Sequence, residues 1–472
     1  MKRLITIVAL ILAAACSLQV PPQTPAPVPT PTPVIELGPV DTLPIIVRVY
    51  VDLLKRQPDP FGIDYYSTRL RSGEMTEATM RAHVMASAEY KALHAPDPPV
   101  PPVPALTVRG RQFYDDSGAL WVPRMVSGLT LLARTSEQQE AFLSWAAKTG
   151  FNGVRVFAGA LTWAGQSADG ARAALPALLD RAARHGLVVE VTAITDSASG
   201  YDTREHVRLL AGLLTNRRGV LFELANEVGH STQAGHVTAE YLRALGRELV
   251  APLGIVWAVG AASVDEPSPD GVYPTSGGTY ATAHLDRGRD PWNQFRRVRE
   301  IYAIAEVTGA PALNNEPLGC AEPGTPGQRY FDPAMALTIG ALDRAFGVGG
   351  VHHSQAGLMA ELPGPVQQAC ADAYVAGHRA IDTVLTGQVG AYLNVGHDGS
   401  PLTRARFTEG GSGDGVVRAY SFIAGDRGVT ILLGAKGDTG LQWSAGWRQV
   451  RVLEERTAHD GRSVVVVELA RQ

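Results

Sequence analysis

The chain has 472 residues, of which 45% are hydrophobic and 19% are charged, and its formal net charge at pH 7 is −4. These values are typical of a globular protein long enough for several domains. The sequence has no GxxxxGK[ST] loop, no convincing GxGxxG element and no basic run with interleaved aromatic residues. Composition and motifs together argue against nucleotide or polynucleotide chemistry, and we expect no nucleic-acid partner.

Residues 1–16 have the pattern of an export signal. Lys2 and Arg3 precede an apolar stretch that is too short to span a bilayer as a mature helix. The stretch ends in three alanines followed by Cys16, which resembles a bacterial lipoprotein signal, whose cysteine is lipidated and becomes the new N-terminus. Plain secretion and an uncleaved anchor are the alternatives. We therefore expect an exported protein, either at the cell envelope through a lipid on Cys16 or extracellular, with no other membrane contact.

Two proline-rich tracts, residues 17–40 and 95–106, favour extended polyproline II and serve as linkers. The segment 41–94 between them predicts a small all-α module. Apolar residues recur at helical spacing in its first part, Pro58 to Gly62 form a turn, and Ser72-Gly73 end a second helix. Thr76 is the expected cap of a third helix, which runs to about residue 93.

This segment resembles a small helical module of unknown function found in exported bacterial proteins. The resemblance implies a non-catalytic unit for adhesion, spacing or docking. It is carried by Tyr50, Leu53, Leu54, Arg56, Pro58-Asp59, Gly62, Tyr65-Tyr66, Gly73 and Ser87-Ala88-Glu89-Tyr90.

From residue 107 to residue 384, short apolar runs alternate with amphipathic helical stretches. This alternation predicts an α/β fold with parallel strands and crossover helices. Eight such units are typical of a (β/α)8 TIM barrel, and a doubly wound open sheet is the alternative. The expected strands are residues 121–127, 153–157, 188–194, 220–225, 255–259, 281–285, 310–314 and 350–353.

Antiparallel strands are expected at both ends of this region. Residues 108–122 contain two short runs around an Asp-Asp-Ser-Gly turn, which predicts a β-hairpin that covers the bottom of the barrel. After residue 384 the helical pattern stops. Residues 385–472 therefore predict a C-terminal antiparallel β domain, β-sandwich-like, with strands at 416–423, 428–433, 449–453 and 463–469.

Two glutamates at the ends of expected strands are the strongest chemical signal. Glu227 follows the fourth strand and Glu316 the seventh, and each is preceded by asparagine. Three βα units of roughly 30 residues each separate two such positions, which matches the spacing of this pair. The carboxyl ends of all strands of a barrel meet at one rim, so the two acids are expected to converge there. Two carboxyl groups at one rim are suited to glycoside cleavage.

Two runs resemble motifs of clan A of the glycoside hydrolases, and within that clan the cellulase-like family. They are Gly150-Phe151-Asn152-Gly153-Val154-Arg155 and Phe222-Glu223-Leu224-Ala225-Asn226-Glu227. The resemblance implies that Glu227 is the acid/base, that Glu316 is the nucleophile and that Arg155 supports Glu316. It also implies that His284 lines the sugar subsite.

Retaining chemistry sets further expectations. The carboxyl groups of Glu227 and Glu316 should lie about 5–5.5 Å apart. Glu227 needs a raised pKa, which burial and a second carboxylate can supply, and Arg155 should hold Glu316 ionised. Asn226 is expected to hydrogen-bond the sugar 2-hydroxyl. Glu223 is expected to be a buried structural acid with a basic partner.

Aromatic and histidine side chains near the rim are the remaining candidates for carbohydrate binding. Trp163 follows the second strand and could stack on a sugar face, as could Trp257 and Trp292. His353 lies where the family usually has an aromatic platform. It forms a pair with His352, but no third ligand falls at a fixed spacing, so we expect no metal and no cofactor.

Cys320 and Cys370 are a candidate disulfide pair. An exported protein meets an oxidising compartment, which permits a bridge, and Cys320 lies just past Glu316. Two separate small core residues are the alternative.

The sequence therefore predicts a retaining glycoside hydrolase that acts on a poly- or oligosaccharide. The first alternative is a barrel that binds glycan without cleaving it and serves in cell-surface attachment, because the family's usual tryptophan is missing after the eighth strand. A metal-dependent hydrolase is the other, and it would need convergent His and Asp ligands.

Overall fold

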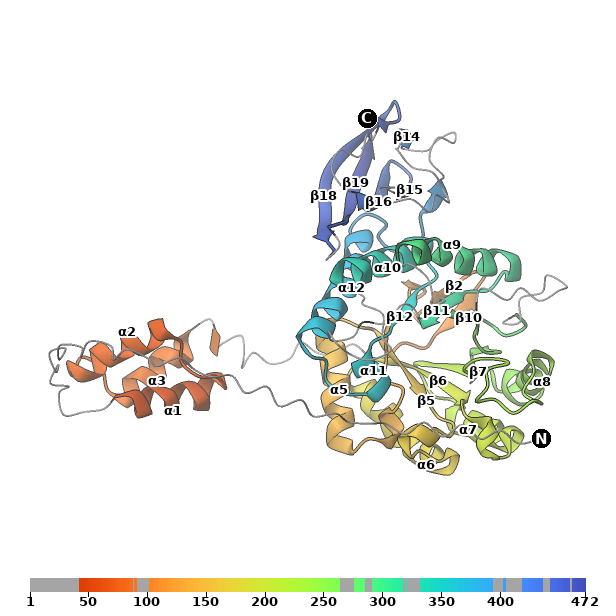
Figure 1. Cartoon of the computed structure of the whole chain (residues 1–472), viewed down its shortest axis with the longest axis horizontal. Coiled ribbons are helices and arrows are strands. Elements are labelled where there is room, and N and C mark those ends of the chain that lie inside the picture. The colour runs from red at the N-terminus through yellow and green to blue at the C-terminus, as the bar shows by residue number, and fades with distance from the viewer. Residues whose placement is uncertain are drawn as a thin grey trace, which may run out of the picture. The chain divides into compact units, whose positions relative to one another are not determined.

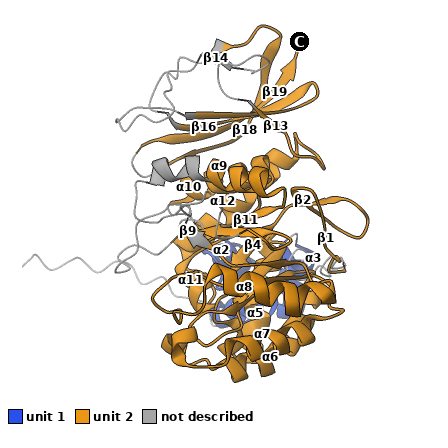
Figure 2. Ribbon diagram, turned by 90° about the vertical axis from the view of Figure 1, so that its right-hand side faces the viewer, with its two compact units in different colours: residues 1–98 blue, residues 99–472 orange. Residues whose placement is uncertain are grey.

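The computed structural model describes residues 42–87, 89–90, 102–263, 276–284, 291–316, 320, 332–393, 402–404, 418–435, 442–458 and 461–472. The chain forms two compact units, residues 1–98 and 99–472 (Figure 2). Among the described residues, no helix combines the length and the apolar character that a membrane crossing requires. The predictions for the export signal and for Cys16 fall outside the described residues.

The N-terminal unit contains three helices, α1 (Leu43–Leu54), α2 (Pro60–Arg71) and α3 (Glu77–Ala86) (Figure 1). The caps follow from the sequence. Asp59 accepts a hydrogen bond from the Gly62 amide at the start of α2, and Thr76 and Thr79 form a reciprocal capping box at the start of α3. The helix α3 ends at Ala86, earlier than expected. The buried residues of this unit are Ile46, Val49, Tyr50, Leu54, Tyr66, Met80 and Val84.

The C-terminal unit is built around a parallel sheet that closes into a barrel (Figure 1). The first strand of the sheet, β4 (Arg124–Ser127), pairs in parallel with the last, β12 (Gly350–His352). An open doubly wound sheet is therefore excluded, and the predicted (β/α)8 barrel is confirmed. The strands between these two are β5 (Gly153–Phe157), β6 (Val188–Ile194), β7 (Val220–Ala225), β8 (Trp257–Ala258), β9 (Ala262–Ser263), β10 (Ala281–His284) and β11 (Ala312–Glu316).

The fifth strand of the barrel is interrupted. Its first part, β8, pairs with β7, and its second part, β9, pairs with β10. Gly260 lies between them with φ +149°, and a Cβ atom at this position would lie 2.5 Å from the carbonyl oxygen of Ala225. Only glycine fits this close approach to the neighbouring strand, and the ladder is therefore broken there.

Helices surround the barrel and bury the outward faces of its strands. For example, Val154 and Val156 of β5 share one core with Phe142 of α5 (Ser136–Thr149) and Leu175 of α6 (Ala168–Arg184). The helix α6 begins earlier than its apolar pattern suggests, because the Ser167 side chain caps it at the Gly170 amide. The other helices are α7 (Thr203–Leu214), α8 (Ala239–Leu245), α9 (Pro291–Thr308), α10 (Pro333–Phe346), α11 (Gln355–Met359) and α12 (Pro365–Asp382).

The predicted hairpin closes the bottom of the barrel. The hairpin is part of a three-stranded antiparallel sheet formed by β1 (Thr107–Arg109), β2 (Gln112–Tyr114) and β3 (Leu120–Trp121). Phe113 of β2 is buried in a cluster with inward residues of the barrel strands, and its ring centroid lies 5.7 Å from that of Tyr280. The apolar bottom layer leaves the opposite rim of the barrel for polar side chains.

The C-terminal residues form a five-stranded antiparallel sheet that packs on barrel helices (Figure 2). Phe422 lies against Phe346 of α10, with ring centroids 4.8 Å apart, and both belong to the barrel's own core. The main partner of the sheet is thus the barrel and not a second large sheet. Its strands are β13 (Ala391–Leu393), β15 (Arg418–Ala424), β16 (Arg427–Ala435), β18 (Trp447–Thr457) and β19 (Ser463–Arg471), and β14 (Leu402–Arg404) pairs separately with β17 (Gln442–Trp443).

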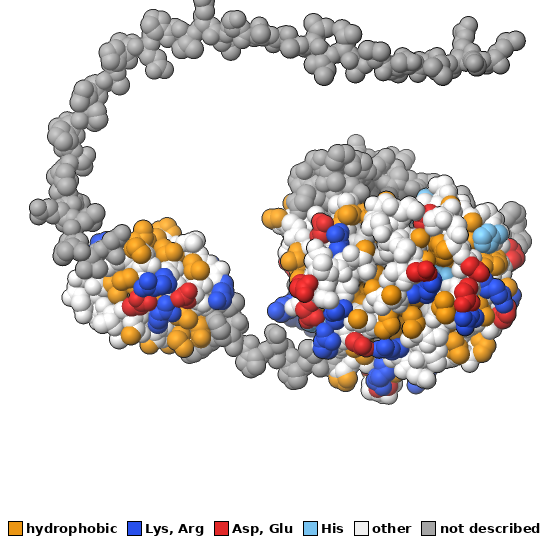
Figure 3. All heavy atoms as spheres, turned by 90° about the horizontal axis from the view of Figure 1, so that it is seen from below, with side chains coloured by type: hydrophobic (Ala, Val, Ile, Leu, Met, Phe, Trp, Pro, Cys, Tyr) orange, Lys and Arg blue, Asp and Glu red, His pale blue; other side chains and the backbone are white. Residues whose placement is uncertain are grey.

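The surfaces visible in Figure 3 carry acidic and basic side chains next to one another on each unit. On the helical unit, for instance, Arg48 pairs with Glu77 and Arg81 pairs with Asp52. Neither visible face presents an extended surface of one sign.

Candidate active site

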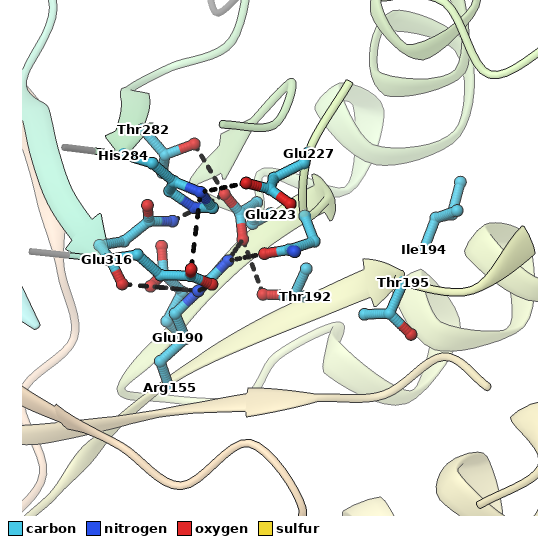
Figure 4. Close-up of polar contacts among 12 residues, drawn as sticks. Arg155, Glu190, Thr192, Ile194, Thr195, Glu223, Glu227, Thr282, His284 and Glu316 are labelled. Atoms are coloured by element: carbon cyan, nitrogen blue, oxygen red, sulfur yellow. Dashed lines mark hydrogen bonds and ion pairs between the residues drawn. The ribbon is translucent and has the colours of Figure 1, made fainter. Parts of the chain in front are cut away.

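Glu227 and Glu316 converge at one rim of the barrel, as the sequence predicts. Glu316 is the last residue of β11, and Glu227 follows β7 and bridges to Ala261. One carboxylate oxygen of each and one ring nitrogen of His284 all lie within 4.8 Å of one another (Figure 4). Two acids that are distant in the chain are therefore close enough to act on the same bond.

A bulge in β11 gives the site two consecutive inward side chains. Ala283 of β10 pairs with Asn314, but His284 pairs with Glu316, so Asn315 is the extra residue. Asn315 and Glu316 then both point into the barrel, where regular alternation would place only one of them. Asn314 contacts Asp343 of α10 on the outside of the barrel.

Arg155 of β5 is fully buried and links the two halves of the site. One terminal nitrogen, Nη1, donates to Glu316 Oε1 at 2.8 Å. The other, Nη2, donates to Glu223 Oε2 at 2.7 Å and to Asn226 Oδ1 at 2.8 Å. A guanidinium at hydrogen-bond distance favours the ionised form of Glu316, which is the form that a nucleophile needs.

Glu223 of β7 is the buried structural acid that the sequence suggests. Besides Arg155, three side chains donate to its two oxygens, each at 2.7 Å: Thr192, Thr282 and Asn315. The four hydrogen bonds satisfy both oxygens without any ligand. Glu223 therefore orients Arg155 and is not free to react.

Glu190 of β6 is a site residue that sequence reasoning missed. It is buried in the same cluster, and the Tyr280 hydroxyl donates to its Oε1 at 2.9 Å. Its Oε2 lies 3.5 Å from Arg155 Nε. Burial, followed by the charge of Glu223, raises the pKa of Glu190 to about 8. The available signal was a glutamate at an inward position of an otherwise apolar strand, Val188-Val189-Glu190-Val191.

His284 lies between the two acids. Its Nδ1 is 3.1 Å from Glu227 Oε1 and 3.7 Å from Glu316 Oε2. The hydrogen bond from His284 holds the pKa of Glu227 below its ordinary value and outweighs burial, which acts in the opposite direction. The expected raised pKa is therefore wrong for the unliganded protein, because a donor faces the carboxylate where the sequence suggested only apolar surroundings and a like charge.

The other predicted binding residues lie at different distances from this centre. Asn226 directs its oxygen to Arg155, so its amide nitrogen is the group available to a ligand. Trp163 lies in the loop after β5 and is 53% exposed. His353 is buried, and its Nδ1 lies 2.9 Å from the Ser127 hydroxyl at the end of β4. The structure thus brings Asn226 and His284 to the acids, whereas Trp163 and His353 lie on neighbouring loops.

Burial shows that Trp257 and His352 are core residues and do not line the rim. Trp257 is 2% exposed and packs against Gly246, so it is a core residue. His352 stacks on Phe151 in the interior, and burial lowers its pKa to about 3. The side chain of Trp292 lies outside the described residues.

Cys320 and Cys370 form a disulfide, with Cα atoms 6.6 Å apart. Cys370 lies in α12, whereas Cys320 follows Glu316 and pairs with the loop after β12. Its amide donates to the His353 carbonyl, and its own carbonyl accepts from Gln355. The bridge therefore fixes a segment next to the candidate nucleophile.

Among the described residues, one group has donor atoms close enough together to hold a metal ion. It consists of Glu227, His284 and Glu316. One oxygen of Glu316 is already engaged by Arg155, and His284 Nδ1 must carry a proton to bond an ionised Glu227. A metal ion held by Glu316 Oε2 would leave the Arg155 contact to Oε1 in place, but it would have to replace the proton on His284 Nδ1.

Comparisons with known proteins agree with this architecture. Residues 39–94 match the family model described as a domain of unknown function (DUF4214), which identifies the small helical module. No curated protein sequence matches the chain. A solved structure described as a glycoside hydrolase has a TM-score of 0.54 at 13% identity and covers 78% of this chain and 92% of its own.

A glycoside hydrolase family 5 structure from Bacteroides vulgatus has a TM-score of 0.53 at 11% identity. It covers 78% of this chain and 93% of its own. At these identities the likeness concerns the fold. The protein therefore combines a DUF4214 module with a (β/α)8 barrel of the fold seen in family 5 glycoside hydrolases.

Proposed function

We propose that the protein is a retaining glycoside hydrolase that cleaves a poly- or oligosaccharide by double displacement. The observation that carries the proposal is the approach of the Glu227 and Glu316 carboxylates, with oxygens within 4.8 Å. This approach supports attack by one acid and protonation by the other, as in a retaining glycosidase.

The contacts of the two acids divide their roles. Glu316 is held by Arg155, which favours a permanently ionised nucleophile. Glu227 is partly exposed at the barrel mouth and shares a hydrogen bond with His284. It can therefore pass a proton to the leaving oxygen, and it can take one from water in the second step. The amide nitrogen of Asn226 would then bind the 2-hydroxyl, since its oxygen is held by Arg155.

The test is turnover of a panel of aryl β-glycosides of glucose, mannose, xylose and cellobiose. The wild-type protein should release the phenol, and Glu316→Ala should abolish the release. Azide added to Glu227→Ala should restore turnover with a glycosyl azide as product, because the anion attacks the anomeric carbon of the glycosyl-enzyme directly, displaces Glu316 and needs no base to activate it. The matched control is Glu454→Ala on β18, which should behave as the wild type.

A catalytically inactive glycan-binding protein is the second candidate, and the predicted loss of an aromatic platform after β12 favours it. This protein would bind oligosaccharides, for example in isothermal titration, yet would release no phenol from any glycoside. Retention of glycan binding by Glu316→Ala together with no wild-type turnover would establish the second candidate over the first.

We also propose that the protein is exported and carries a lipid on Cys16. The basic and apolar start of the chain and the disulfide between Cys320 and Cys370 support this proposal. Metabolic labelling with a palmitate analogue should modify the wild-type protein and leave Cys16→Ala unmodified. Release of unlabelled wild-type protein into the medium would instead favour plain secretion.

A further inference from the structure

Glu190 is the one carboxyl of the buried cluster for which the proposed reaction has no use. It is fully buried in β6, and Tyr280, just before β10, donates to its Oε1 at 2.9 Å. Its second oxygen, Oε2, has no hydrogen-bond partner among the described residues. A buried charged oxygen without a partner is costly, so its protonation state needs an explanation.

The unpartnered oxygen faces an unpartnered donor. Arg155 Nε lies 3.5 Å from Glu190 Oε2, beyond a good hydrogen bond, and it too lacks a partner among the described residues. The other end of the guanidinium is fully used, because it donates to Glu316 and Glu223. One cation thus faces three carboxyl groups, and it is held closer to two of them.

The charges explain why Arg155 lies closer to Glu316 and Glu223 than to Glu190. Glu223 accepts four hydrogen bonds, and Glu316 accepts one from Arg155, so both are suited to the ionised form. Ionisation of Glu190 as well would place three negative charges around one positive charge in the interior. This excess of negative charge is avoided if Glu190 keeps its proton. Burial raises the pKa of Glu190 to about 8, which favours the protonated form.

We propose that Glu190 is a positioning residue for the nucleophile and acts through Arg155. In its protonated form it is an uncharged neighbour, so Arg155 stays with Glu316 and Glu223. When it ionises at alkaline pH it becomes a third competitor for the guanidinium and draws Arg155 Nε toward Oε2, away from Glu316. The groups that face it are Arg155 on β5, Glu223 on β7, Tyr280 before β10 and Glu316 on β11.

This inference rests on the proposed function. Its test uses a substrate whose cleavage does not require a proton from Glu227, so that the effect of Glu190 is measured by itself. A 2,4-dinitrophenyl glycoside has a leaving group that needs no protonation, so its kcat/KM does not depend on Glu227 as an acid. With the fastest of the 2,4-dinitrophenyl glycosides of glucose, mannose, xylose and cellobiose, wild-type kcat/KM should fall severalfold between pH 7 and pH 9.5. Glu190→Gln mimics the protonated form and should remove this fall, whatever its kcat/KM at pH 7.

A second variant covers the case in which Glu190→Gln does not fold. Tyr280→Phe removes the hydrogen bond donated to Glu190 and little else. That bond lowers the pKa of Glu190, so its loss should move the alkaline fall to higher pH. A purely structural role for Tyr280 would change the level of kcat/KM and leave its pH dependence where it was.

The matched control is Asp343→Asn in α10. Asp343 is also a fully buried carboxyl that accepts from a tyrosine hydroxyl, Tyr374, and burial raises its pKa well above the ordinary value. It contacts Asn314 and not Arg155. This variant should change stability yet retain the wild-type alkaline fall, because the effect requires the guanidinium.

The outcomes separate the two proposals. No turnover of any aryl glycoside by the wild-type protein contradicts the proposed function, and the role of Glu190 falls with it. Turnover with the same alkaline fall in wild type and Glu190→Gln, or with no fall in either, leaves the function standing and overturns the role of Glu190.

Discussion

His284 Nδ1 lies 3.1 Å from Glu227 Oε1 and 3.7 Å from Glu316 Oε2, so one histidine faces both the proposed proton donor and the proposed nucleophile. The other oxygen of Glu227 lies 3.8 Å from His230 Nε2, a longer and more exposed contact. The pKa of Glu227 is therefore lowered mainly by one histidine, His284 of β10.

The first prediction concerns the pH dependence of leaving-group protonation. The hydrogen bond from His284 lowers the pKa of Glu227, and an acid catalyst works only below its own pKa. His284→Ala should therefore move the alkaline limb of kcat/KM for a poor leaving group to higher pH. The highest value that kcat/KM reaches over the pH range should be lower than in the wild type.

His230→Ala is the matched control for this measurement. The His230 charge is the smallest of the effects on the pKa of Glu227, so this limb should move far less than in His284→Ala. Equal shifts in the two variants would contradict the assignment of His284 as the principal donor. A methyl glycoside as substrate keeps the protonation step rate-determining.

The second prediction separates the charge of Arg155 from its geometry. Arg155→Met leaves buried carboxylates without their cation and should lower the free energy of unfolding by about 3–5 kcal/mol. Arg155→Lys keeps a charge but not the planar fork that reaches Glu316 and Glu223 together, so it should lose less stability and still lose most of kcat.

Urea denaturation and kcat on one aryl glycoside check the Arg155 variants. The control is Arg208→Met, which removes an exposed pair with Glu205 on α7 and should cost less than about 1 kcal/mol. A fully active Arg155→Lys protein would show that the nucleophile does not need the bidentate partner.

The third prediction concerns the disulfide. Cys320 and Cys370 are separated by 50 residues, and loss of a bridge that closes a loop of this size should lower the free energy of unfolding by about 2–4 kcal/mol. Since Cys320 also bonds to the His353 backbone near Glu316, the double variant to serine should lose part of kcat. Guanidinium denaturation with and without a reducing agent is the measurement, and the reductant should have no effect on the variant.

The fourth prediction concerns Trp163. Its side chain is half exposed on the rim, so Trp163→Ala should change stability by no more than about 0.5 kcal/mol. Loss of a stacking contact of about 1 kcal/mol should raise KM for an oligosaccharide roughly fivefold and leave kcat near the wild-type value. Val307→Ala, which shortens an exposed apolar side chain near the end of α9, should leave KM unchanged. The result would speak against a sugar platform if both variants had the same KM.

The strands and their order follow from the sequence to a large extent. Buried strands are short apolar runs, and residues 153–157, 188–194 and 220–225 have the predicted bounds. The likeness to the fold of clan A hydrolases holds over the barrel. Short strands such as β13, β14 and β17 have too few residues for any alternation to be recognised. The interruption of the fifth strand lies at Gly260, where the chain passes close to the carbonyl oxygen of Ala225 on the neighbouring strand, a contact that no local pattern predicts.

The convergence of Glu227 and Glu316 was predictable, because parallel strands of a barrel bring their carboxyl ends to one rim. Two features of the site were not. The bulge that turns Asn315 inward breaks the alternation on which sequence reasoning depends. The role of Glu190 requires Tyr280, which lies 90 residues later in the chain and reaches it only across the barrel. Electrostatics of this kind arises from tertiary neighbours and not from local pattern.

The central claim is that Glu316 forms a covalent bond with the sugar. A 2,4-dinitrophenyl 2-deoxy-2-fluoro glycoside should inactivate the protein, because the fluorine slows the second step more than the first. Mass spectrometry of the digested protein should then place one added fluorosugar on the peptide that contains Glu316, and Glu316→Gln should remain unlabelled. A label on Glu227 or another residue, or turnover of the parent substrate with inversion at the anomeric carbon, would contradict the account.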